Sequence, residues 1–313
     1  MRLETDLARL RATGDPREFG RVAVLAGGRS SEREISQSSG HAVLTALARR
    51  GVDAVGFDPA EQGIAALSAQ CDRVWIALHG AGGEDGTVQG ALECLGLPYT
   101  GSGVTGAAVG MDKLLTKRLA RGIGISTPDY VVLNGPADFD TAIDQLGLPL
   151  IVKPARHGSS IGMTKVERAV DLSRAFGAAR ALDASVFAER WISGGEYTVG
   201  ILRGSALPSI RIESGRDDDN RYLCPSGLSA PAERHLASLA LAIFETTGAW
   251  GWGRVDFMVD VAGRPLLLEI NTVPGMSDRS LVPLAARTAG IEFDELAWRV
   301  LETSLVRVPR GDL

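Results

Sequence analysis

The chain has 313 residues, of which 45% are hydrophobic and 23% are charged, as expected for a globular protein with two or three domains and a large core. Its net charge of -5 and pI near 5.5 give no electrostatic reason to expect nucleic acid or an anionic membrane as a partner. No apolar run reaches the length of a membrane span, no signal peptide is recognisable, and three widely spaced cysteines predict reduced thiols in the cytoplasm.

The N-terminal part of the chain alternates apolar, strand-like runs with helical segments. The capping-box spacing of Ser31 and Glu34 predicts a helix that extends to about Arg50, and a second helix begins near Thr87. This alternation predicts a parallel, doubly wound α/β sheet in a domain of residues 1–103, with ligands at the carboxyl ends of its strands. The predicted strands are residues 21–28, 53–59 and 74–80.

Two further domains, residues 104–190 and 191–313, are predicted to be α+β units with antiparallel sheets. The first begins with a helix from Met111, and its sheet includes two strands around the glycine-serine loop of residues 148–166. The second is built on a hairpin at residues 251–276. The remaining predicted elements are helices at 137–147, 168–181 and 232–247, strands at 185–192 and 194–204, and a last helix from near Phe293.

The predicted hairpin presents a cluster of charged and amide side chains. With a turn at 261–264, Asp256 faces Glu269 and Arg254 faces Asn271, and the alternation of side chains places all four on one face. Opposed carboxylates repel, and a divalent cation removes that repulsion. Two carboxylates and an amide oxygen are hard ligands, which suit Mg²⁺ better than zinc. The alternative is a solvated polar face in which Arg254 pairs with one acid. The opposite face is predicted to carry Val255, Phe257, Leu268 and Ile270.

Two glycine-containing loops are candidate anion sites. GGRSSERE follows the first strand and offers backbone N–H groups at a helix N-terminus, where Glu32 either complements the helix dipole or contacts a ligand amine. In KPARHGSSIGM, Lys153 precedes Gly158, Ser159 and Ser160. Such a loop can close over phosphates while the lysine supplies a point charge, and an ordinary hairpin loop is the alternative.

Each of four charged or titratable residues has both a functional and a structural interpretation. His79 ends an apolar strand, either as a hydrogen-bonded structural residue or as part of a site, and Lys113 is either a phosphate ligand or solvated surface. Glu189 and Glu196 flank a strand end, where a carboxylate can bind ribose hydroxyls and the strand-end backbone can read an adenine edge. A solvated acidic edge is the alternative for both glutamates.

The segment after the hairpin holds a further candidate site. Gly275 and Met276 form a turn whose amides can stabilise an oxyanion. Ser280 stands where it can cap the next helix, and that structural role is the alternative to a ligand contact.

Together these motifs resemble those of ATP-grasp ligases, and more narrowly of D-alanine–D-alanine ligases. The resemblance covers nearly the whole chain from Arg21 onward, and its motifs run in family order: GGRSSEREIS, LHGAGGEDGTVQGALECLGLPYTGSG, MDKLLTK, VKPARHGSSIGM, GGEYTV, LPSIRIE, YLCPSGL, GWGRVDFMVD, LEINTVPGM and SLVP. It implies an ATP-dependent carboxylate–amine ligase that joins two D-alanines through an acyl phosphate, for peptidoglycan precursor synthesis. It also implies ATP gripped between the two antiparallel sheets, two Mg²⁺ ions with Mn²⁺ as an alternative, a cytoplasmic location and a homodimer.

The resemblance also implies a role for each residue that matches a family motif. Glu32, Ser159, Arg254, Gly275 and Ser280 would act in catalysis, and the D-alanine substrates would contact Glu32, His79, Arg254, Gly275, Ser280 and Leu281. ATP would be bound by Lys113, Lys153, Gly158, Ser159, Ser160, Glu189, Arg190, Ile192 and Glu196, and the metal ions by Asp256, Glu269 and Asn271.

One segment departs from the family pattern. Between IRIE and YLCP the family usually carries a longer loop with a Tyr-Asp-Tyr-x-x-Lys-Tyr pattern, and here the segment is only SGRDDDNR, residues 214–221. Either Arg216 replaces the missing lysine, or the enzyme is slow or has a different acceptor, or the chain retains only ligand binding. A nicotinamide dehydrogenase, suggested by the first glycine turn alone, lacks the G-x-G-x-x-G spacing.

Overall fold

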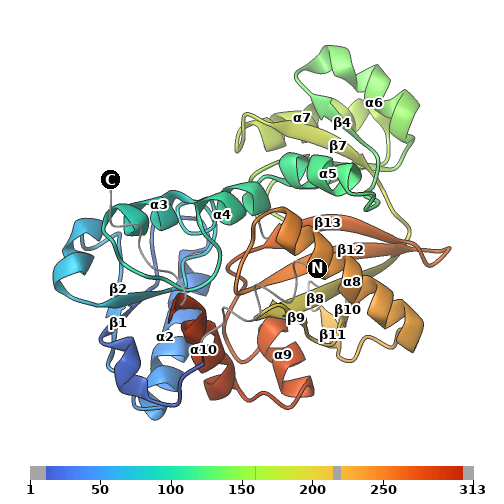
Figure 1. The fold of residues 1–313 in the computed structure, drawn as a ribbon. Coiled ribbons are helices and arrows are strands. Elements are labelled where there is room, and N and C mark those ends of the chain that lie inside the picture. The colour runs from blue at the N-terminus through green and yellow to red at the C-terminus, as the bar shows by residue number, and fades with distance from the viewer. Residues whose placement is uncertain (1–11, 159, 214–219, 306–313) are drawn as a thin grey trace.

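The computed structural model describes residues 12–158, 160–213 and 220–305, and Figure 1 shows its three sheets. The first sheet is parallel, with strand order β2-β1-β3. Its strands are β1 (Val22–Leu25), β2 (Ala54–Phe57) and β3 (Arg73–Ile76), with helices α2 (Arg33–Arg49) and α3 (Thr87–Cys94) and the 3-10 turns η1 (Pro16–Phe19) and η2 (Ile64–Ala69). All four residues of the central strand β1 are buried. The predicted parallel sheet is confirmed.

The start of α2 differs from its prediction. The helix begins at Arg33, and its N-cap Glu32 makes no capping bond with its side chain, so the predicted capping box of Ser31 and Glu34 is wrong. Ser30 takes the local role instead, because its hydroxyl accepts the N–H of Glu32 and donates to the carbonyl of His79. This bond fastens the helix start to the loop after β3, where His79 lies beyond the end of the strand.

Two consecutive helices, α4 (Val104–Met111) and α5 (Lys113–Gly122), lead from the first sheet to the second. The residue between them, Asp112, has an extended backbone, and its carboxylate accepts the N–H groups of Leu114 and Leu115. Only α5 was predicted. The sequence of α4 contains two glycines, which disfavour helix, but a Cβ on Gly106 would lie 2.4 Å from the carbonyl oxygen of Gly248. Close packing against this neighbour therefore requires the glycine.

The second sheet is antiparallel, with order β4-β7-β5-β6. Its strands are β4 (Tyr130–Leu133), β5 (Leu150–Pro154), β6 (Thr164–Val166) and β7 (Val186–Arg190). Helices α6 (Phe139–Leu146) and α7 (Leu172–Arg180), with the turns η3 (Pro136–Asp138) and η4 (Ala169–Asp171), complete this unit. Helix and strand side chains bury one another in a separate core that includes Leu146, Leu150 and Ala175. On the other face of the sheet, Ile151 and Lys153 line a cavity.

The third sheet runs β11-β10-β8-β12-β13, and the short β9 pairs with β8. Its strands are β8 (Gly194–Leu202), β9 (Ser205–Ala206), β10 (Ile210–Glu213), β11 (Arg221–Leu223), β12 (Trp252–Asp260) and β13 (Pro265–Asn271). The associated helices are α8 (Ala230–Thr246), α9 (Leu281–Thr288), α10 (Phe293–Glu302) and the turn η6 (Thr303–Leu305). No helix within the described ranges is long and apolar enough to cross a membrane.

The β12–β13 hairpin has the predicted register where it matters for the site. Asp256 pairs with Glu269 and Arg254 pairs with Asn271. A bulge then shifts the register, so Phe257 pairs with Leu267 and the extra residue is Leu268. The prediction that Leu268 lies on the core face is therefore wrong, because Leu267 is the buried residue and Leu268 lines a cavity.

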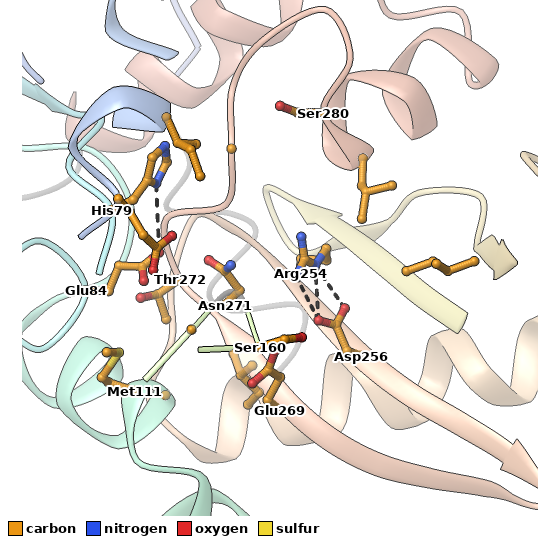
Figure 2. Close-up of a pocket in the computed structure, with 18 of the residues that line it drawn as sticks. His79, Glu84, Met111, Ser160, Arg254, Asp256, Glu269, Asn271, Thr272 and Ser280 are labelled. Carbon is orange, nitrogen blue, oxygen red and sulfur yellow. Dashed lines mark hydrogen bonds and ion pairs between the residues drawn. The ribbon is translucent and has the colours of Figure 1, made fainter. Parts of the chain in front are cut away.

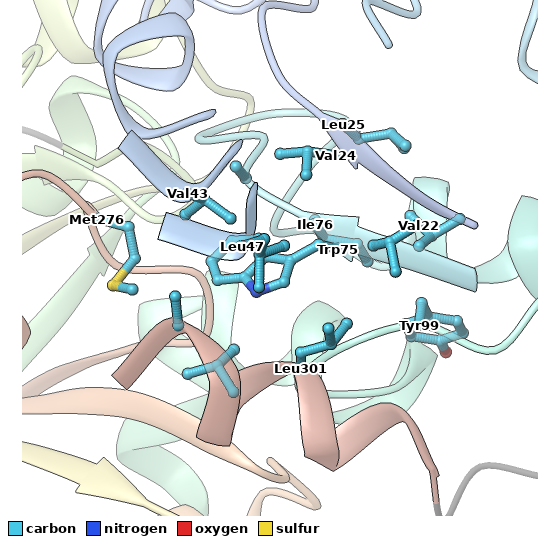
Figure 3. Packing of buried hydrophobic residues seen from close by; sticks show 14 of the residues in the cluster. Val22, Val24, Leu25, Val43, Leu47, Trp75, Ile76, Tyr99, Met276 and Leu301 are labelled. Carbon is cyan, nitrogen blue, oxygen red and sulfur yellow. The ribbon is translucent and has the colours of Figure 1, made fainter. Parts of the chain in front are cut away.

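One hydrophobic cluster joins the first and third units (Figure 3). It includes Trp75 of β3, Met276 from the turn after β13 and Leu301 of α10. The ring centroids of Trp75 and Trp252 lie 5.5 Å apart. The C-terminal helix thus packs beside α2 of the first unit, although the third sheet precedes it in sequence. The domain borders at residues 103 and 190 stay a prediction.

Candidate active site

Two adjoining cavities bring the three units together. The smaller, of about 430 Å³, is lined by Glu32 and His79 of the first unit, Gly158 of the second, and Arg254 and Asp256 of the third. The larger, of about 760 Å³, is lined by residues of the second and third sheets. Both cavities are lined by Lys113, Gly158, Ser160, Glu196, Ile212 and Glu269. The site thus has two compartments that share a charged boundary.

At this boundary each carboxylate of the hairpin has a cationic partner. The Arg254 guanidinium donates to both carboxylate oxygens of Asp256, at 2.9 and 2.8 Å (Figure 2), and the Thr198 hydroxyl donates to Asp256 at 2.5 Å. Lys113 Nζ lies 2.7 Å from Glu269. Burial opposes the ionisation of Glu269, but Lys113 and then Arg254 outweigh it and lower the pKa of this carboxyl. The pairing predicted as the alternative for Arg254 is therefore present, in a buried site and not on a solvated face.

The donor atoms at this boundary suit a hard divalent cation. Asp256 and Glu269 face each other, and Asn271 follows on the same face, with its amide oxygen 3.2 Å from the backbone nitrogen of Val273. Among the described residues no group of three His, Cys, Asp or Glu side chains could hold a metal. A metal at this hairpin would therefore need the amide oxygen beside the two carboxylates, as the sequence predicts. Such oxygen donors fit Mg²⁺.

The larger cavity reaches a buried ion-pair network. Glu189 of β7 is only 2% exposed, and its two oxygens form ion pairs with Lys153 of β5 and Lys117 of α5. The interpretation of Glu189 as a solvated acidic edge is therefore wrong. Burial, reinforced by the charges of Asp256 and Glu269, raises the pKa of Glu196 to about 7. Glu196 is half-buried at the boundary of the two cavities, so it is not a solvated edge either.

The remaining residues expected to bind a nucleotide also lie on this cavity. Arg190 and Ile192 follow Glu189 along its wall, and the loop residues Gly158 and Ser160 lie at its boundary with the smaller cavity. Ser160 has a positive φ of 56°. Ser159 and Arg216 lie outside the described residues.

In the smaller cavity, Glu32 of the first unit meets the glycine-serine loop. Its carboxylate lines the cavity, and a Cβ on Gly158 would lie only 3.0 Å from its Oε1 atom. Two motifs that are far apart in the sequence are thus in contact, and a side chain at position 158 would crowd Glu32. Whether this contact serves the binding of a ligand amine stays a prediction.

His79 is a hydrogen-bonded structural residue that also lines the smaller cavity. Its Nδ1 lies 2.8 Å from the carbonyl oxygen of Val273, which can only accept, so Nδ1 carries the proton. Nε2 therefore accepts from the Ser39 hydroxyl at 2.9 Å, and the Ser39 oxygen accepts the N–H of Met276 at 3.0 Å. Burial lowers the pKa of His79 to about 4. The pair His79 and Ser39 thus fixes the turn that contains Gly275.

Sequence reasoning assigned no role to several buried polar residues at or beside the site, among them Ser39, Glu84, Lys117 and Thr198. Glu84 lies in the loop that contains His79 (Figure 2) and accepts the N–H of Gly80 at 3.0 Å. Burial, reinforced by the charge of Glu32, raises the pKa of Glu84 to about 8, so this carboxyl is protonated at neutral pH. Its position in a glycine-rich loop after a buried strand was the available signal.

Ser280 does not cap the helix that follows it. It occupies the N-cap position of α9, but its side chain makes no capping bond and accepts the N–H of Ser277 at 3.0 Å. The capping interpretation is therefore wrong. Gly275 lies beside it, since a Cβ there would be 3.0 Å from Ser280 Oγ, and both residues line the smaller cavity together with Leu281.

Comparison with known proteins agrees with this geometry. A family described as "D-ala D-ala ligase C-terminus" matches residues 119–302, and one described as "D-ala D-ala ligase N-terminus" matches residues 57–102. A D-alanine–D-alanine ligase of Alkalilimnicola ehrlichii is 56% identical over 293 residues, which are 90% of this chain and 94% of the relative. A D-alanine–D-alanine ligase of Laribacter hongkongensis is 51% identical and covers 92% of this chain and 97% of its own.

Solved structures agree as well. The Bacillus anthracis D-alanine–D-alanine ligase complexed with ATP has a TM-score of 0.83 and 34% identity, covering 91% of this chain and 97% of its own. This likeness confirms the predicted fold class, a parallel α/β unit followed by antiparallel ATP-grasp sheets. The chain therefore belongs to the D-alanine–D-alanine ligase family.

Proposed function

We propose that this chain joins two D-alanines into D-alanyl-D-alanine with the hydrolysis of ATP, as a cytoplasmic step of peptidoglycan precursor synthesis. The observation that carries the proposal is the boundary between the two cavities. There Lys113, Glu269 and Glu196 face both compartments, so a phosphate from one can meet a carboxylate from the other. Relatives at 56% and 51% identity carry the name of this ligase.

We place ATP in the larger cavity, between the second and third sheets. The base would lie against the end of β7 at Arg190 and Ile192, and Glu189 and Glu196 would serve adenine and ribose. The phosphates would lie at the shared boundary, held by Lys113 and Lys153 and covered by the loop of Gly158, Ser159 and Ser160. Lysine suits this role because it provides a compact point charge. The Bacillus anthracis neighbour is described as an ATP complex.

We propose two Mg²⁺ ions, or Mn²⁺ in their place, at Asp256, Glu269 and Asn271. When bound, such ions neutralise charge on phosphate oxygens and orient the transferred group. In the structure Lys113 pairs with Glu269 and Arg254 pairs with Asp256. A metal bound to these two carboxylates would free both cations to contact anionic groups of the substrates.

The smaller cavity would hold the two D-alanines. Glu32 would bind the ammonium of the first, and the fixed turn beside His79 would place the Gly275 amide, together with Arg254, at its carbonyl. Ser280 and Leu281 would hold the carboxylate of the second. Because Ser280 Oγ is not used as a helix cap, its position along the cavity wall is consistent with this role.

The chemistry then has two steps. A carboxylate oxygen of the first D-alanine attacks the γ-phosphorus, the bond from that phosphorus to the bridging oxygen breaks, and ADP leaves. The amine of the second D-alanine then attacks the acyl carbonyl, the carbon–oxygen bond to phosphate breaks, and the nitrogen releases its proton. Negative charge develops on the carbonyl oxygen in the second step, where Arg254 and the Gly275 amide would stabilise it.

The test is the D-alanine-dependent formation of dipeptide, ADP and phosphate, measured by mass spectrometry and coupled ADP detection. Acceptor choice is resolved by supplying D-alanine with D-serine or D-lactate. Preferential formation of D-alanyl-D-alanine supports the proposal. Preferential formation of another product would mean that the chain is a related ATP-grasp ligase with a different acceptor. Absence of turnover with ATP still bound leaves an inactive ATP-binding homologue.

The shortened segment at 214–221 favours a slower ligase as a second candidate. Residues 214–219 lie outside the described part of the chain, and the strands that flank them, β10 and β11, pair from Glu213 and Arg221 onward. Tyr222 of β11 lines the smaller cavity. Replacing 214–221 with a longer family loop should raise kcat if the short segment limits the reaction.

We also propose a homodimer, on family resemblance. Light scattering during size-exclusion chromatography at two protein concentrations distinguishes a mass near 66 kDa, roughly twice the 33.0 kDa of one chain, from that of a monomer.

A further inference from the structure

Lys117 is a buried charged residue that the proposed mechanism does not use. It lies on α5 with 0% of its surface exposed. A lysine at such a site is costly to bury unless its charge is paired and its N–H groups are hydrogen-bonded. Its surroundings meet both conditions. Because Lys117 contacts Glu189, which lines the larger cavity, we ask what its burial does for this cavity.

Lys117 stands where four elements of the chain meet. Its Nζ donates to the Thr127 hydroxyl at 2.8 Å and to the Leu267 carbonyl at 3.2 Å, and it forms an ion pair with Glu189 of β7. Thr127 also donates to the Leu267 carbonyl, at 2.9 Å, and the Leu267 N–H donates to Ser126 at 2.8 Å. In Figure 1, α5 lies between the second sheet and β13. The lysine thus connects both sheets that enclose the larger cavity.

The Glu189 carboxylate pairs with two lysines at once. One carboxylate oxygen contacts Lys117 and the other contacts Lys153. Burial opposes the ionisation of Glu189, and the two lysines outweigh it, so its pKa lies below the ordinary value. Lys153 is also the residue proposed to bind nucleotide phosphate. Lys153 cannot pair with Glu189 and with phosphate at full strength at the same time. If Lys117 were absent, moving Lys153 to the phosphate would leave the buried Glu189 carboxylate without a cation.

We propose that Lys117 is a positioning residue of the nucleotide site: it holds Glu189 as a stable buried anion and thereby frees Lys153 to bind nucleotide phosphate. This inference rests on the proposed function, because it takes the larger cavity as the nucleotide site. Burial lowers the pKa of Lys117 to about 8, with Glu189 opposing the shift, so the ammonium remains charged at neutral pH. Lys117 itself does not line either cavity.

The test compares nucleotides with and without phosphate. Dissociation constants of ADP and adenosine are measured by calorimetry for the wild type and for Lys117→Met, Lys153→Met and the double variant. In Lys117→Met, Lys153 must stay with Glu189, so ADP binding should weaken by roughly tenfold or more while adenosine binding changes by less than about twofold. Lys153→Met should show the same selectivity, and the double variant should bind ADP no more weakly than Lys153→Met alone.

Two controls separate this role from a merely structural one. Thr127→Val removes the hydroxyl that bonds to Lys117 but leaves the ion pair between Lys117 and Glu189. The ratio of ADP affinity to adenosine affinity should therefore stay that of the wild type. Arg203→Met removes the cation of a partly buried ion pair with Glu302, outside both cavities. It should lower the melting temperature without changing the same ratio.

The inference is overturned by equal losses for ADP and adenosine, by additive losses in the double variant, or by a change of the ratio in Arg203→Met. If the wild type forms dipeptide and Lys117→Met binds ADP normally, the inference alone fails. If the wild type binds ADP without forming dipeptide, the proposed ligation fails and the ADP comparison still decides the role of Lys117. If the wild type does not bind ADP, both fail.

Discussion

At the scale of single residues, each of the two opposed acidic side chains of the hairpin has a cationic partner. Asp256 pairs with Arg254 on its own strand, and Glu269 pairs with Lys113 from α5. The register that opposes these two acids could be predicted from strand alternation and a glycine turn. Pairing of Arg254 with one of the acids was the predicted alternative, but the partner Lys113 could not be predicted, because the approach of α5 to β13 is a tertiary contact with no local signal.

The first prediction concerns Asp256. The Asp256→Asn variant keeps the shape of the side chain but removes one negative charge from the proposed metal site. We expect kcat for dipeptide formation to fall by about 10²-fold or more, because charge stabilisation at the phosphoryl group is lost. Stopped assays of dipeptide measure this. Asp260→Asn, on the same strand but outside both cavities, is the matched control and should retain activity.

The second prediction concerns Glu84 and pH. The pKa of Glu84 is raised from 4.5 to about 8 in the folded protein. Between these values the folded state binds a proton that the unfolded state has released, so the contribution of Glu84 to stability falls as pH rises and levels off above pH 8. His79 acts in the opposite direction, since its lowered pKa makes stability rise between about pH 4 and pH 6.5.

A comparison of the wild type with Glu84→Gln isolates the glutamate. Relative to the wild type, the variant should gain on the order of 2–4 kcal/mol of unfolding free energy between pH 5 and pH 8. Urea denaturation at several pH values measures the difference. A difference that does not change with pH would mean that Glu84 is ionised in the folded protein.

At the scale of elements, the turn after β13 is fixed by the first unit and not by its own sequence. Ser39 of α2 and His79 hold the backbone of Val273 and Met276, and so place Gly275. Sequence reasoning identified the turn and Gly275 but not Ser39, because a serine in a helix has no pattern that reveals a contact some 240 positions away. The bulge at Leu268 escaped prediction for a related reason, since the backbone of the adjacent Leu267 bonds to the Ser126 carbonyl and the Thr127 hydroxyl, between α5 and β4.

The third prediction tests this turn. Ser39→Ala removes the hydroxyl that accepts the Met276 N–H and donates to His79, leaving two buried polar groups without that partner. We expect a loss of about 1–3 kcal/mol in unfolding free energy and a fall in kcat that exceeds any change in ATP affinity. Ser38→Ala, one position earlier on an exposed part of the same helix, is the control. Equal changes in kcat and ATP affinity would argue against a local role for the turn.

At the scale of the whole molecule, three units converge on one boundary. The family resemblance predicted this convergence, because its motifs are spread along nearly the whole chain. Periodicity and turn signals predicted the parallel sheet, the hairpin and several helices, including those at α6, α7, α8 and α10. The packing of α10 on α2 and the continuous core from Trp75 to Leu301 were not predictable, since helix amphipathicity does not name the surface that a helix covers.

The fourth prediction follows from the position of the larger cavity between two sheets. A ligand that contacts both sheets stabilises the folded state by mass action. Mg²⁺ with ADP at about 100 times the dissociation constant should raise the melting temperature by roughly 3–6 °C. A chelator that removes Mg²⁺ should abolish most of the rise, while adenosine should give a small rise that the chelator leaves unchanged. Scanning fluorimetry measures both.

The most direct test of the account follows the oxygen atoms of the substrate. D-alanine labelled with ¹⁸O in its carboxylate is incubated with Mg²⁺ and ATP, and the released phosphate is analysed by mass spectrometry. Because a carboxylate oxygen of the first D-alanine attacks the γ-phosphorus and later leaves with it, each dipeptide formed should be accompanied by one phosphate that carries ¹⁸O from D-alanine. Dipeptide formed with unlabelled phosphate, or labelled substrate that yields no dipeptide, would contradict the account.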